Sequence, residues 1–443
     1  MLSCCFNASA QSTMDNYFTG TNAFTEIAGA TQNVLAPHDL DFVPGRPNEL
    51  WVLNKETNGG SVVLIFNAGK SNQATQHRRD SHNEHFMARS VAIAFGANDY
   101  FGSAQEIKNT VGDLTTTFMG PALWSSDTSI FARLHQNNWI PGQLLGSHID
   151  MLHQSPYGMG IAHDSANVYW YFDGHNGNIC RYDFATPHGV GEDDHSDGRI
   201  YRYTDVTVTR TPNIPSHMIM DKTNRWLYFI DGGTNKVMRL KTNSGTLGAT
   251  IPVPNTAGEP LGAYKAITGA VKEDVITSGV TKPCGIDYKD GRLVVSDNAT
   301  GDIHVYNVNS MPATLVGTIP TGAAGVMGVK IDNDNRIWFV NKTTNKVIRI
   351  DNPNVLGVDD VASAINYAVY PNPASDVLNI ELKDNKTSQP ALIRIFDVLG
   401  RQVFTQTTGA ANTAINTSRW AKGAYTVAIS YREATAVTKV IIQ

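Results

Sequence analysis

The sequence lacks the features that mark several protein classes. It has no run of about 18 uncharged apolar residues, so no segment is long enough to span a membrane as a helix. Charged residues make up only 17% of the chain and the formal net charge is -5, which gives no basic excess for binding nucleic acid or anionic lipid. No Gly-x-Ser-x-Gly motif, phosphate-binding loop or dinucleotide fingerprint occurs.

Cysteine is also scarce. The four cysteines are Cys4, Cys5, Cys180 and Cys284. Near the N-terminus, Ala8-x-Ala10 is typical of a signal-peptidase site, and the apolar stretch before it is too short for a complete signal peptide. We therefore interpret residues 1–10 as the residual part of a leader that begins upstream; an N-terminal tail is the alternative. The mature chain then keeps Cys180 and Cys284, either as a disulfide or as two buried thiols.

What the sequence does contain favours strands. The 38 glycines and the abundant Thr, Asn and Val are typical of strands and tight turns rather than helices. A chain of 443 residues has room for two or three domains, or for one large repeat domain and a small one.

From residue 367 onward, short alternating strands are separated by turns. The alternating segments begin near Val377, Ile393, Gly423 and Lys439, and Asn-Pro, Leu-Gly and Lys-Gly dipeptides break them. This pattern predicts a small antiparallel β-sandwich over residues 367–443.

The same segment resembles the C-terminal sorting domain of the type IX secretion system. The family pattern is Tyr-Pro-Asn-Pro, then Leu-Gly-Arg, then Gly-x-Tyr, then a terminal Lys-Val-x-x-Gln. All four occur here in order, at 370–373, 399–401, 423–425 and 439–443. The resemblance implies a Bacteroidetes-type protein that passes through the periplasm, engages the type IX machinery through residues 367–443, and is secreted or held at the outer-membrane surface. The alternative is a generic immunoglobulin-like domain. A sorting domain directs export and says nothing about the chemistry of the protein.

Residues 34–355 contain an imperfect repeat. Each copy has an apolar strand ending in Asp, an aromatic or β-branched strand, a polar turn and a last strand. Six copies begin near residues 38, 89, 159, 217, 284 and 327. Because one four-stranded unit cannot bury both faces, six predict a closed ring. The predicted fold is all-β: a lead-in at 11–33, a six-bladed β-propeller resembling the NHL-repeat class, a linker at 356–366 and a small Ig-like β-sandwich.

Two polar segments interrupt this repeat. Residues 103–156, which include His148 and His153, predict an insertion that is either functional or a folded cover over one propeller face. Residues 77–85 place His82 and His85 three positions apart, on one face if helical. We interpret this second segment as a solvated loop, with shaping of the channel mouth as the alternative.

The residue that opens each repeat is expected near one mouth of the central channel, because the first strand of each blade lines it. The six opening residues are His38, Arg89, Met159, His217, Cys284 and Met327. Imidazole and sulfur groups are metal ligands, although methionine and cysteine also pack as core side chains. We predict a metal site on His38 and His217, with Met159, Cys284 and Met327 as further ring ligands; packing of the sulfur residues is the alternative.

The Pro-His-Asp context at 37–39 and the Pro-Ser-His context at 215–217 resemble peptidyl-α-hydroxyglycine amidating lyase, a propeller of this class. The resemblance implies that the two histidines hold zinc and that Arg89 binds substrate. That family uses three histidines on alternating blades, whereas here two lie on opposite blades and no third occupies the position. A sulfur ligand would then complete the site, which favours zinc or copper(I); the alternative is that His163, His175 or a histidine of residues 103–156 reaches in.

Two functions follow from these residues. The first is a secreted metal-dependent lyase or hydrolase, with zinc or copper in the channel, Arg89 gripping an anionic substrate and Tyr157 as a catalytic phenol. The alternative is a non-catalytic surface propeller that binds a glycan, peptide or partner protein. A redox role through copper is a third hypothesis.

A channel metal on His38 and His217 predicts near-stoichiometric zinc or copper in the purified, leaderless protein and its loss in a His38→Ala/His217→Ala double variant. Elemental analysis of both proteins, after reconstitution with each metal, measures this. Failure of the wild-type protein to take up either metal would remove the metal-dependent and redox hypotheses.

Overall fold

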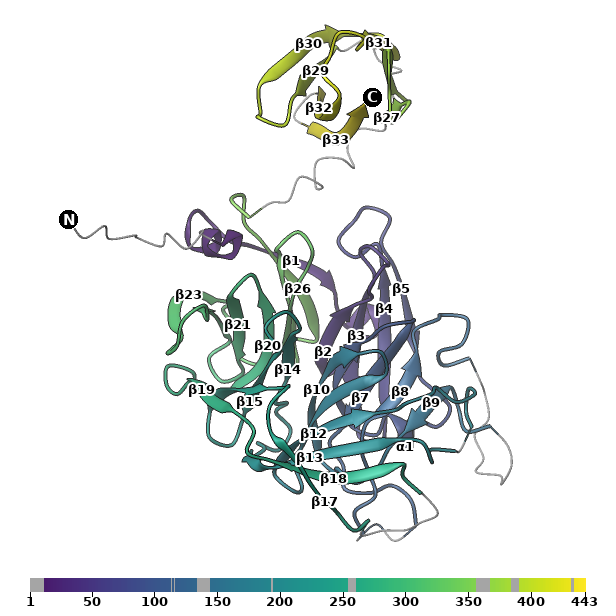
Figure 1. Ribbon diagram of the computed structural model, residues 1–443, viewed down its shortest axis with the longest axis vertical. Helices are drawn as coiled ribbons and strands as arrows, with labels where there is room; N and C mark the ends of the chain where they lie inside the picture. The colour runs from purple at the N-terminus through teal and green to yellow at the C-terminus, as the bar shows by residue number, and fades with distance from the viewer. Residues whose placement is uncertain are drawn as a thin grey trace, which may run out of the picture. The chain divides into compact units, whose positions relative to one another are not determined.

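The structure is a computed structural model with two units, Met1–Asn354 and Val355–Gln443 (Figure 1). It describes residues 12–112, 114, 116–133, 144–192, 194–253, 260–355, 367–383, 390–431 and 434–443. The predicted leader at 1–10 and the predicted linker at 356–366 lie outside the described residues, so both stay predictions. No helix of the described chain combines the length and the apolar character needed to cross a membrane.

The first unit consists of sheets that we call blades 1 to 6. Blade 1 has β2 (Pro37–Phe42), β3 (Leu50–Lys55), β4 (Gly60–Phe66) and β5 (Ala74–Arg78). Blade 2 has β6 (Ser90–Phe95), β7 (Tyr100–Gln105), β8 (Ala122–Ser125) and β9 (His148–Met151). Blade 3 has β10 (Gly158–Ser165), β11 (Val168–Asp173), β12 (Asn178–Asp183) and β13 (Arg199–Thr207).

The remaining blades repeat this order with two variations. Blade 4 has β14 (Met218–Asp221), β15 (Trp226–Asp231), β16 (Lys236–Lys241) and β19 (Lys272–Ile276). Blade 5 has β20 (Pro283–Lys289), β21 (Arg292–Asp297), β22 (Asp302–Asn307) and β23 (Thr314–Pro320). Blade 6 has β24 (Val326–Ile331), β25 (Ile337–Asn341) and β26 (Lys346–Asp351), with β1 (Ala23–Ala28) as its fourth strand. A hairpin of β17 (Thr246–Thr250) and β18 (Ala263–Thr268) extends blade 3, with β18 parallel to β13.

The first strands of the blades form a closed ring. β2 contacts β6, β6 contacts β10, and contacts continue through β14, β20 and β24 back to β2. Figure 1 shows β2, β10, β14 and β20 together at the middle of the unit. This is the arrangement of a β-propeller, so the predicted fold class is confirmed.

The second strand of each blade explains why the sheets stack. In β3, the side chains of Leu50 to Leu53 are all fully buried, and Tyr169 to Phe172 in β11 behave in the same way. Neighbouring blades cover both faces of these strands, so the apolar run is continuous rather than alternating. Trp51, Trp170 and Trp338 on these strands are among the largest buried side chains.

The N-terminal segment does more than lead into the propeller. The sixth repeat supplies only β24, β25 and β26, and β1 pairs antiparallel with β26 to complete the sheet. The preceding 3-10 helix η1 (Thr13–Phe18) is anchored by the carboxylate of Asp15, which accepts hydrogen bonds of 2.6 and 2.7 Å from the Arg292 guanidinium. Residues 12–28 therefore close the ring between its two ends; a short 3-10 helix, η2 (Ala30–Gln32), leads to β2.

The structure of residues 103–156 also differs from the one that the sequence predicts. β8 and β9 lie within it and form the third and fourth strands of blade 2, so the prediction of an insertion is wrong for these residues. Each of the two strands has only four residues, too few to show an alternating pattern in the sequence.

The two cysteines that the structure describes do not pair. Cys180 on β12 and Cys284 on β20 are free and fully buried. Burial raises the pKa of Cys180 to about 11 and that of Cys284 to about 12. Of the two alternatives left open by the sequence, the structure has two buried thiols.

The second unit is a two-sheet sandwich, as predicted. One sheet has β27 (Tyr367–Tyr370), β28 (Val377–Leu382) and β31 (Asn412–Asn416). The other has β29 (Ala391–Phe396), β30 (Gln402–Thr408), β32 (Gly423–Tyr431) and β33 (Ala434–Ile442). Alternate residues such as Leu378 and Ile380, or Ile393 and Ile395, point into the shared core, which is why period-2 patterning marked this domain in the sequence.

The closure of the ring can be tested at Tyr17. Its buried hydroxyl accepts a hydrogen bond from the backbone N–H of Ile337 (2.8 Å) and lies 3.2 Å from the carbonyl of Ile350. Tyr17→Phe leaves a buried N–H unsatisfied, so the free energy of unfolding should fall by about 1–3 kcal/mol. Urea denaturation of the propeller measures this.

The matched control is Tyr100→Phe, since the half-buried Tyr100 hydroxyl makes no hydrogen bond to another described residue. Its effect should stay within about 0.5 kcal/mol. Equal stability of the two variants would mean that the N-terminal segment does not hold the ring closed.

Candidate functional site

Five of the six repeat-opening residues are buried at the inner edge of the blades, and Arg89 is half-buried. The sulfur side chains among them are engaged in packing: Met159 lies in the apolar cluster with Trp170 and Phe172, and Cys284 lies with Met327 in the cluster between blades 5, 6 and 1. The Cys284 thiol is 3.2 Å from the carbonyl of Val326, and the Met327 sulfur accepts a contact of 3.5 Å from the Asn298 amide. These are contacts of core side chains; metal binding by them stays a prediction.

His38 has the properties of a neutral imidazole with one nitrogen to spare. Its Nδ1 is 2.8 Å from the carbonyl of Ala36, and its Nε2 is buried with no hydrogen-bond partner among the described residues. Burial holds its pKa well below the ordinary value, and repulsion from Lys55 adds to this. A neutral ring with an open lone pair is the form that binds metals.

His217 is more constrained. Its Nε2 is 2.9 Å from the carbonyl of Val91, and its Nδ1 is 3.5 Å from a carboxylate oxygen of Asp39. Both ring nitrogens therefore face groups of the protein. A metal on His217 would have to replace one of these two contacts.

Arg89 and Tyr157 are held by the segment between β13 and β14. Both have a backbone in the left-handed region, with φ of 52° and 56°. The Arg89 guanidinium donates a hydrogen bond of 3.2 Å to the side-chain oxygen of Asn213, while the Arg210 guanidinium lies 4.1 Å above the Tyr157 ring. The structure thus brings Arg89 and Tyr157 to one end of the propeller, where the first strands of the blades begin.

Charged residues that the sequence did not single out surround Arg89. The buried carboxylate of Glu106, which follows β7, contacts the ammonium of Lys55 and accepts hydrogen bonds from Arg210 (3.1 Å) and from the backbone N–H of Asn213 (2.8 Å). The Lys55 ammonium also donates to Asn213, at 3.3 Å. We call Lys55, Arg89, Glu106, Arg210 and Asn213 the mouth cluster.

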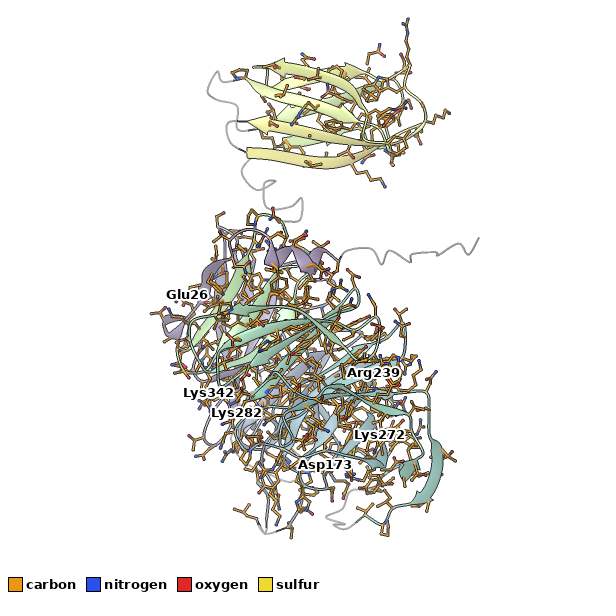
Figure 2. All side chains as sticks on the ribbon, turned by 90° about the vertical axis from the view of Figure 1, so that its left-hand side faces the viewer. Glu26, Asp173, Arg239, Lys272, Lys282 and Lys342 are labelled. Atoms are coloured by element: carbon orange, nitrogen blue, oxygen red, sulfur yellow. The ribbon has the colours of Figure 1, made fainter. Side chains whose placement is uncertain are left out.

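The mouth cluster carries excess positive charge. Burial lowers the pKa of Lys55. The attraction of Glu106 opposes this shift, whereas repulsion from Arg89 and Lys342 adds to it. Lys342, labelled in Figure 2, is thus a fourth cation near Lys55. Among the described residues, Glu106 is the one carboxylate that forms ion pairs with these cations. The chain as a whole has a net charge of -5, so this positive site is local.

The opposite end of the channel holds a cavity of about 260 Å³ that residues of all six first strands line. Its charges are internally balanced. Burial alone would lower the pKa of Lys330, but Asp41, Asp287 and Asp39 raise it above its ordinary value, while burial raises the pKa of Asp287 to about 6. A cavity of this size is below the usual range for organic ligands and its charges are already paired.

A third polar region lies at the outer edges of blades 2 and 3. Five histidine rings form a connected group, with ring centres 5.7 Å apart for His85 and His153, and 6.4 Å apart for His195 with each of His148, His153 and His188. All but His188 are at least nine-tenths buried. We call these five residues, together with Asp150 and Asp197, the histidine cluster.

The histidine cluster corrects the interpretation of residues 77–85 as a solvated loop. His82 is fully buried and precedes the single turn of helix α1 (Asn83–Phe86), in which His85 is 4% exposed. The ring of Phe86 stacks on His148 at 3.6 Å, and this packing draws the segment inward.

Hydrogen bonds through Nδ1 fix the rings. His148 Nδ1 is 2.7 Å from the carbonyl of Leu145, and His195 Nδ1 is 2.6 Å from the carboxylate of Asp150. Burial raises the pKa of Asp150, although the contacts with His195 and His188 oppose that shift. The sequence signal for this region was the concentration of histidines in three short segments, at 82–85, 148–153 and 188–195, but nothing in their spacing joined them.

Fold and C-terminal sequence together define a class: a propeller protein with a secretion sorting domain. Residues 368–443 match the family model described as the secretion system C-terminal sorting domain. The prediction from the Tyr-Pro-Asn-Pro and terminal Lys-Val motifs is confirmed, so the protein engages the type IX secretion system and is secreted to the cell surface.

Comparison of the chain with known proteins gives no more specific identification. No curated protein sequence matches the chain. Among solved structures, PorZ, a surface component of the type IX secretion system of Porphyromonas gingivalis, is 13% identical over 92% of this chain, with a TM-score of 0.39; the match spans 59% of PorZ. The chain is also similar to an auxiliary nutrient-binding protein of Bacteroides ovatus, at 12% identity over 75% of this chain and 77% of that one, with a TM-score of 0.47. It is similar as well to a streptogramin B lyase, at 14% identity over 74% of this chain and 97% of the lyase, with a TM-score of 0.43.

The sorting domain predicts the fate of a truncated chain. Removal of residues 367–443 should leave the propeller in the periplasm, because it then lacks the sorting domain. The propeller should still fold, because it is a separate unit with its own core. Immunoblots of periplasmic, surface and medium fractions measure this. As a control, the same residues fused to an unrelated periplasmic carrier should bring the carrier to the surface; a truncated propeller that still reaches the surface would contradict the assignment.

Proposed function

We propose that this exported propeller binds an anionic ligand at the mouth of its channel, without catalysis. The observation that carries the proposal is the mouth cluster, in which Lys55, Arg89 and Arg210 surround the single carboxylate of Glu106. Lys342 adds a fourth cation. A carboxylate or sulfate group offers the charge that this group of cations lacks, and positive potential focused at the mouth would draw such a ligand in.

Arg89 is the residue best placed to grip the ligand. One Nη atom is used by Asn213, while its Nε is buried and has no hydrogen-bond partner among the described residues. A guanidinium presents its donors in a planar fork that matches both oxygens of a carboxylate or sulfate. We therefore expect acidic glycans, or peptides with a carboxylate at the contact point, as the ligand class.

Binding without catalysis is favoured by how Glu106 is used. General acid–base chemistry needs a group that exchanges a proton with the substrate. The oxygens of Glu106 are already engaged, because they contact Lys55 and accept hydrogen bonds from Arg210 and the backbone N–H of Asn213. Tyr157 lies beneath Arg210, and this contact favours a role in packing the guanidinium rather than in catalysis.

The second candidate keeps the enzyme hypothesis. In that version the chain is a six-bladed NHL-type propeller related in function to amidating lyase, with zinc or copper on His38 and His217 and Arg89 as the substrate-binding residue. The buried, unpartnered Nε2 of His38 favours it. The contacts of His217 with Val91 and Asp39 count against it, because one of them would have to break.

The anion site predicts that Arg89→Gln weakens binding of carboxylated or sulfated glycans. Loss of a hydrogen bond to a charged group costs about 1.5–3 kcal/mol, which corresponds to roughly a 10- to 100-fold higher Kd. Titration calorimetry with polygalacturonate and dextran sulfate fragments measures it, and wild-type affinity should fall as salt rises.

Lys236→Gln is the control, since Lys236 is a cation on blade 4 that is paired with Asp274 at 3.0 Å, outside the mouth cluster. It should bind like the wild type. The proposal fails if neutral dextran binds as tightly as the acidic fragments, or if Arg89→Gln and Lys236→Gln behave alike.

A further inference from the structure

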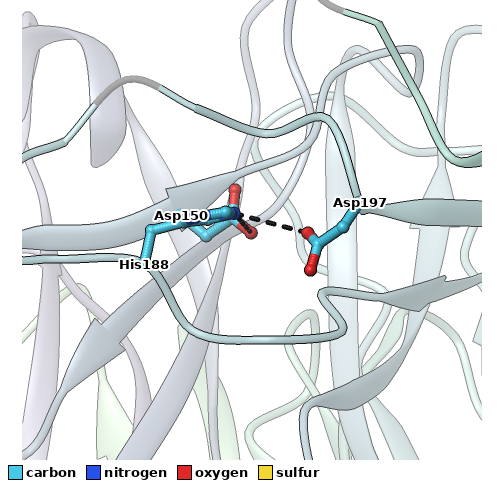
Figure 3. Close-up of side chains that lie close together, drawn as sticks. All are labelled: Asp150, His188 and Asp197. Carbon is cyan, nitrogen blue, oxygen red and sulfur yellow. Dashed lines mark ion pairs between the residues drawn. The ribbon is translucent and has the colours of Figure 1, made fainter.

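We propose that Asp150, His188 and Asp197 bind a divalent transition-metal ion, with zinc as the best match. This site lies in the histidine cluster at the outer edge of the propeller, and it is distinct from both the mouth cluster and the His38–His217 pair. Figure 3 shows the three side chains converging. Each offers one ligand atom, and these atoms all lie within 4.8 Å of one another.

His188 Nε2 lies within ion-pair distance of both carboxylates, but no hydrogen bond joins the three ligand atoms. His188 Nε2 is 3.4 Å from an oxygen of Asp197 and 3.8 Å from Oδ2 of Asp150. All three atoms are buried, and none has a hydrogen-bond partner among the described residues. Polar atoms that are buried together without partners are costly, so an arrangement of this kind indicates a bound group that satisfies all three.

The separations fit a metal ion. Zinc binds imidazole nitrogen and carboxylate oxygen at about 2.0–2.2 Å, so two ligands at a tetrahedral angle are about 3.4 Å apart. The two distances from His188, 3.4 and 3.8 Å, are close to this value. Three protein ligands also leave a fourth position for water or for a group from another molecule.

His195 is the positioning residue of the site. Its Nδ1 lies 2.6 Å from Oδ1 of Asp150, so one carboxylate oxygen is fixed and Oδ2 faces His188. Metal-binding carboxylates are commonly oriented in this way by a hydrogen bond to the oxygen that does not bind the metal. The Asp150 side chain is fully buried, which makes it the most firmly placed of the three ligands.

The ligand set selects the type of metal. One imidazole and two carboxylates suit zinc, manganese or iron(II), whereas calcium requires six or more oxygen ligands. Asp150 belongs to β9 in blade 2, while His188 and Asp197 belong to the segment between β12 and β13 in blade 3. The ion would therefore join the outer edges of two neighbouring blades.

The test uses the full chain after removal of metals with a chelator and dialysis. Titration with zinc chloride, followed by calorimetry and elemental analysis, should give one equivalent bound by the wild type. Asp150→Asn/His188→Gln should lose it, and Asp197→Asn, at a partly exposed side chain, should bind at least about tenfold more weakly. His195→Gln should weaken binding by about 10- to 100-fold.

Two control variants separate zinc binding at this site from zinc binding by histidines elsewhere in the chain. His304→Gln removes a buried histidine of blade 5 that contacts Thr318, and should bind zinc as the wild type does. The His38→Ala/His217→Ala variant should also keep its equivalent of zinc. Calcium chloride should give no binding.

Thermal unfolding guards against a variant that simply misfolds. Zinc should raise the unfolding midpoint of the wild type and of His304→Gln, should raise that of Asp197→Asn by less at the same zinc concentration, and should leave that of Asp150→Asn/His188→Gln unchanged. The proposal is overturned if the wild type binds no zinc, which would mean that His188 only bridges two carboxylates. Binding that is lost with His148→Gln/His153→Gln but kept in Asp150→Asn/His188→Gln would overturn it too.

Discussion

The close approach of neighbouring first strands around the channel is the constraint on which the propeller depends. These strands are not joined in one sheet, and side chains help to connect them. The carboxylate of Asp39 accepts the backbone N–H of Ile93 in blade 2 at 2.9 Å, and Asp287 accepts that of Ile331 in blade 6 at 2.7 Å. At Gly285 a Cβ atom would collide with the carbonyl of Met327, so that position requires glycine. Since ring closure needs this proximity, side chains near the channel axis become buried.

That constraint determines where chemistry can occur in this protein. Residues at the start of the first strands, such as His38 and Cys284, are drawn into the core, whereas the segments beyond the strand ends have room for charged groups. Lys55 and Glu106 lie directly at or after the end of a second strand, and Arg210 and Asn213 come from a connecting segment. The outer edges offer the other opportunity, because a fourth strand such as β9 faces a loop of the next blade, and Asp150 meets His188 and His195 there.

Several elements followed from local pattern alone. The sorting domain has fixed motifs, and its alternating strands pack one face inward, as Leu378 and Ile380 do. The apolar second strands were visible because burial on both faces makes them continuous. Strand β1 was not, because its role depends on β26, more than 300 residues later. The four-residue strands β8 and β9 were missed because they carry too short a pattern, and residues 77–85 read as polar although Phe86 and His148 bury them.

The sequence by itself determined the fold class and the route of export, because strand periodicity and the sorting motifs are properties of neighbouring residues. It also placed Arg89 at the opening of a repeat, directly before the first strand β6. Only the tertiary structure decided what surrounds that residue and which histidines meet. Glu106 reaches Arg210 across 104 positions, and His195 reaches Asp150 across 45. Ring closure brings such residues together, and no local pattern records the distance between blades.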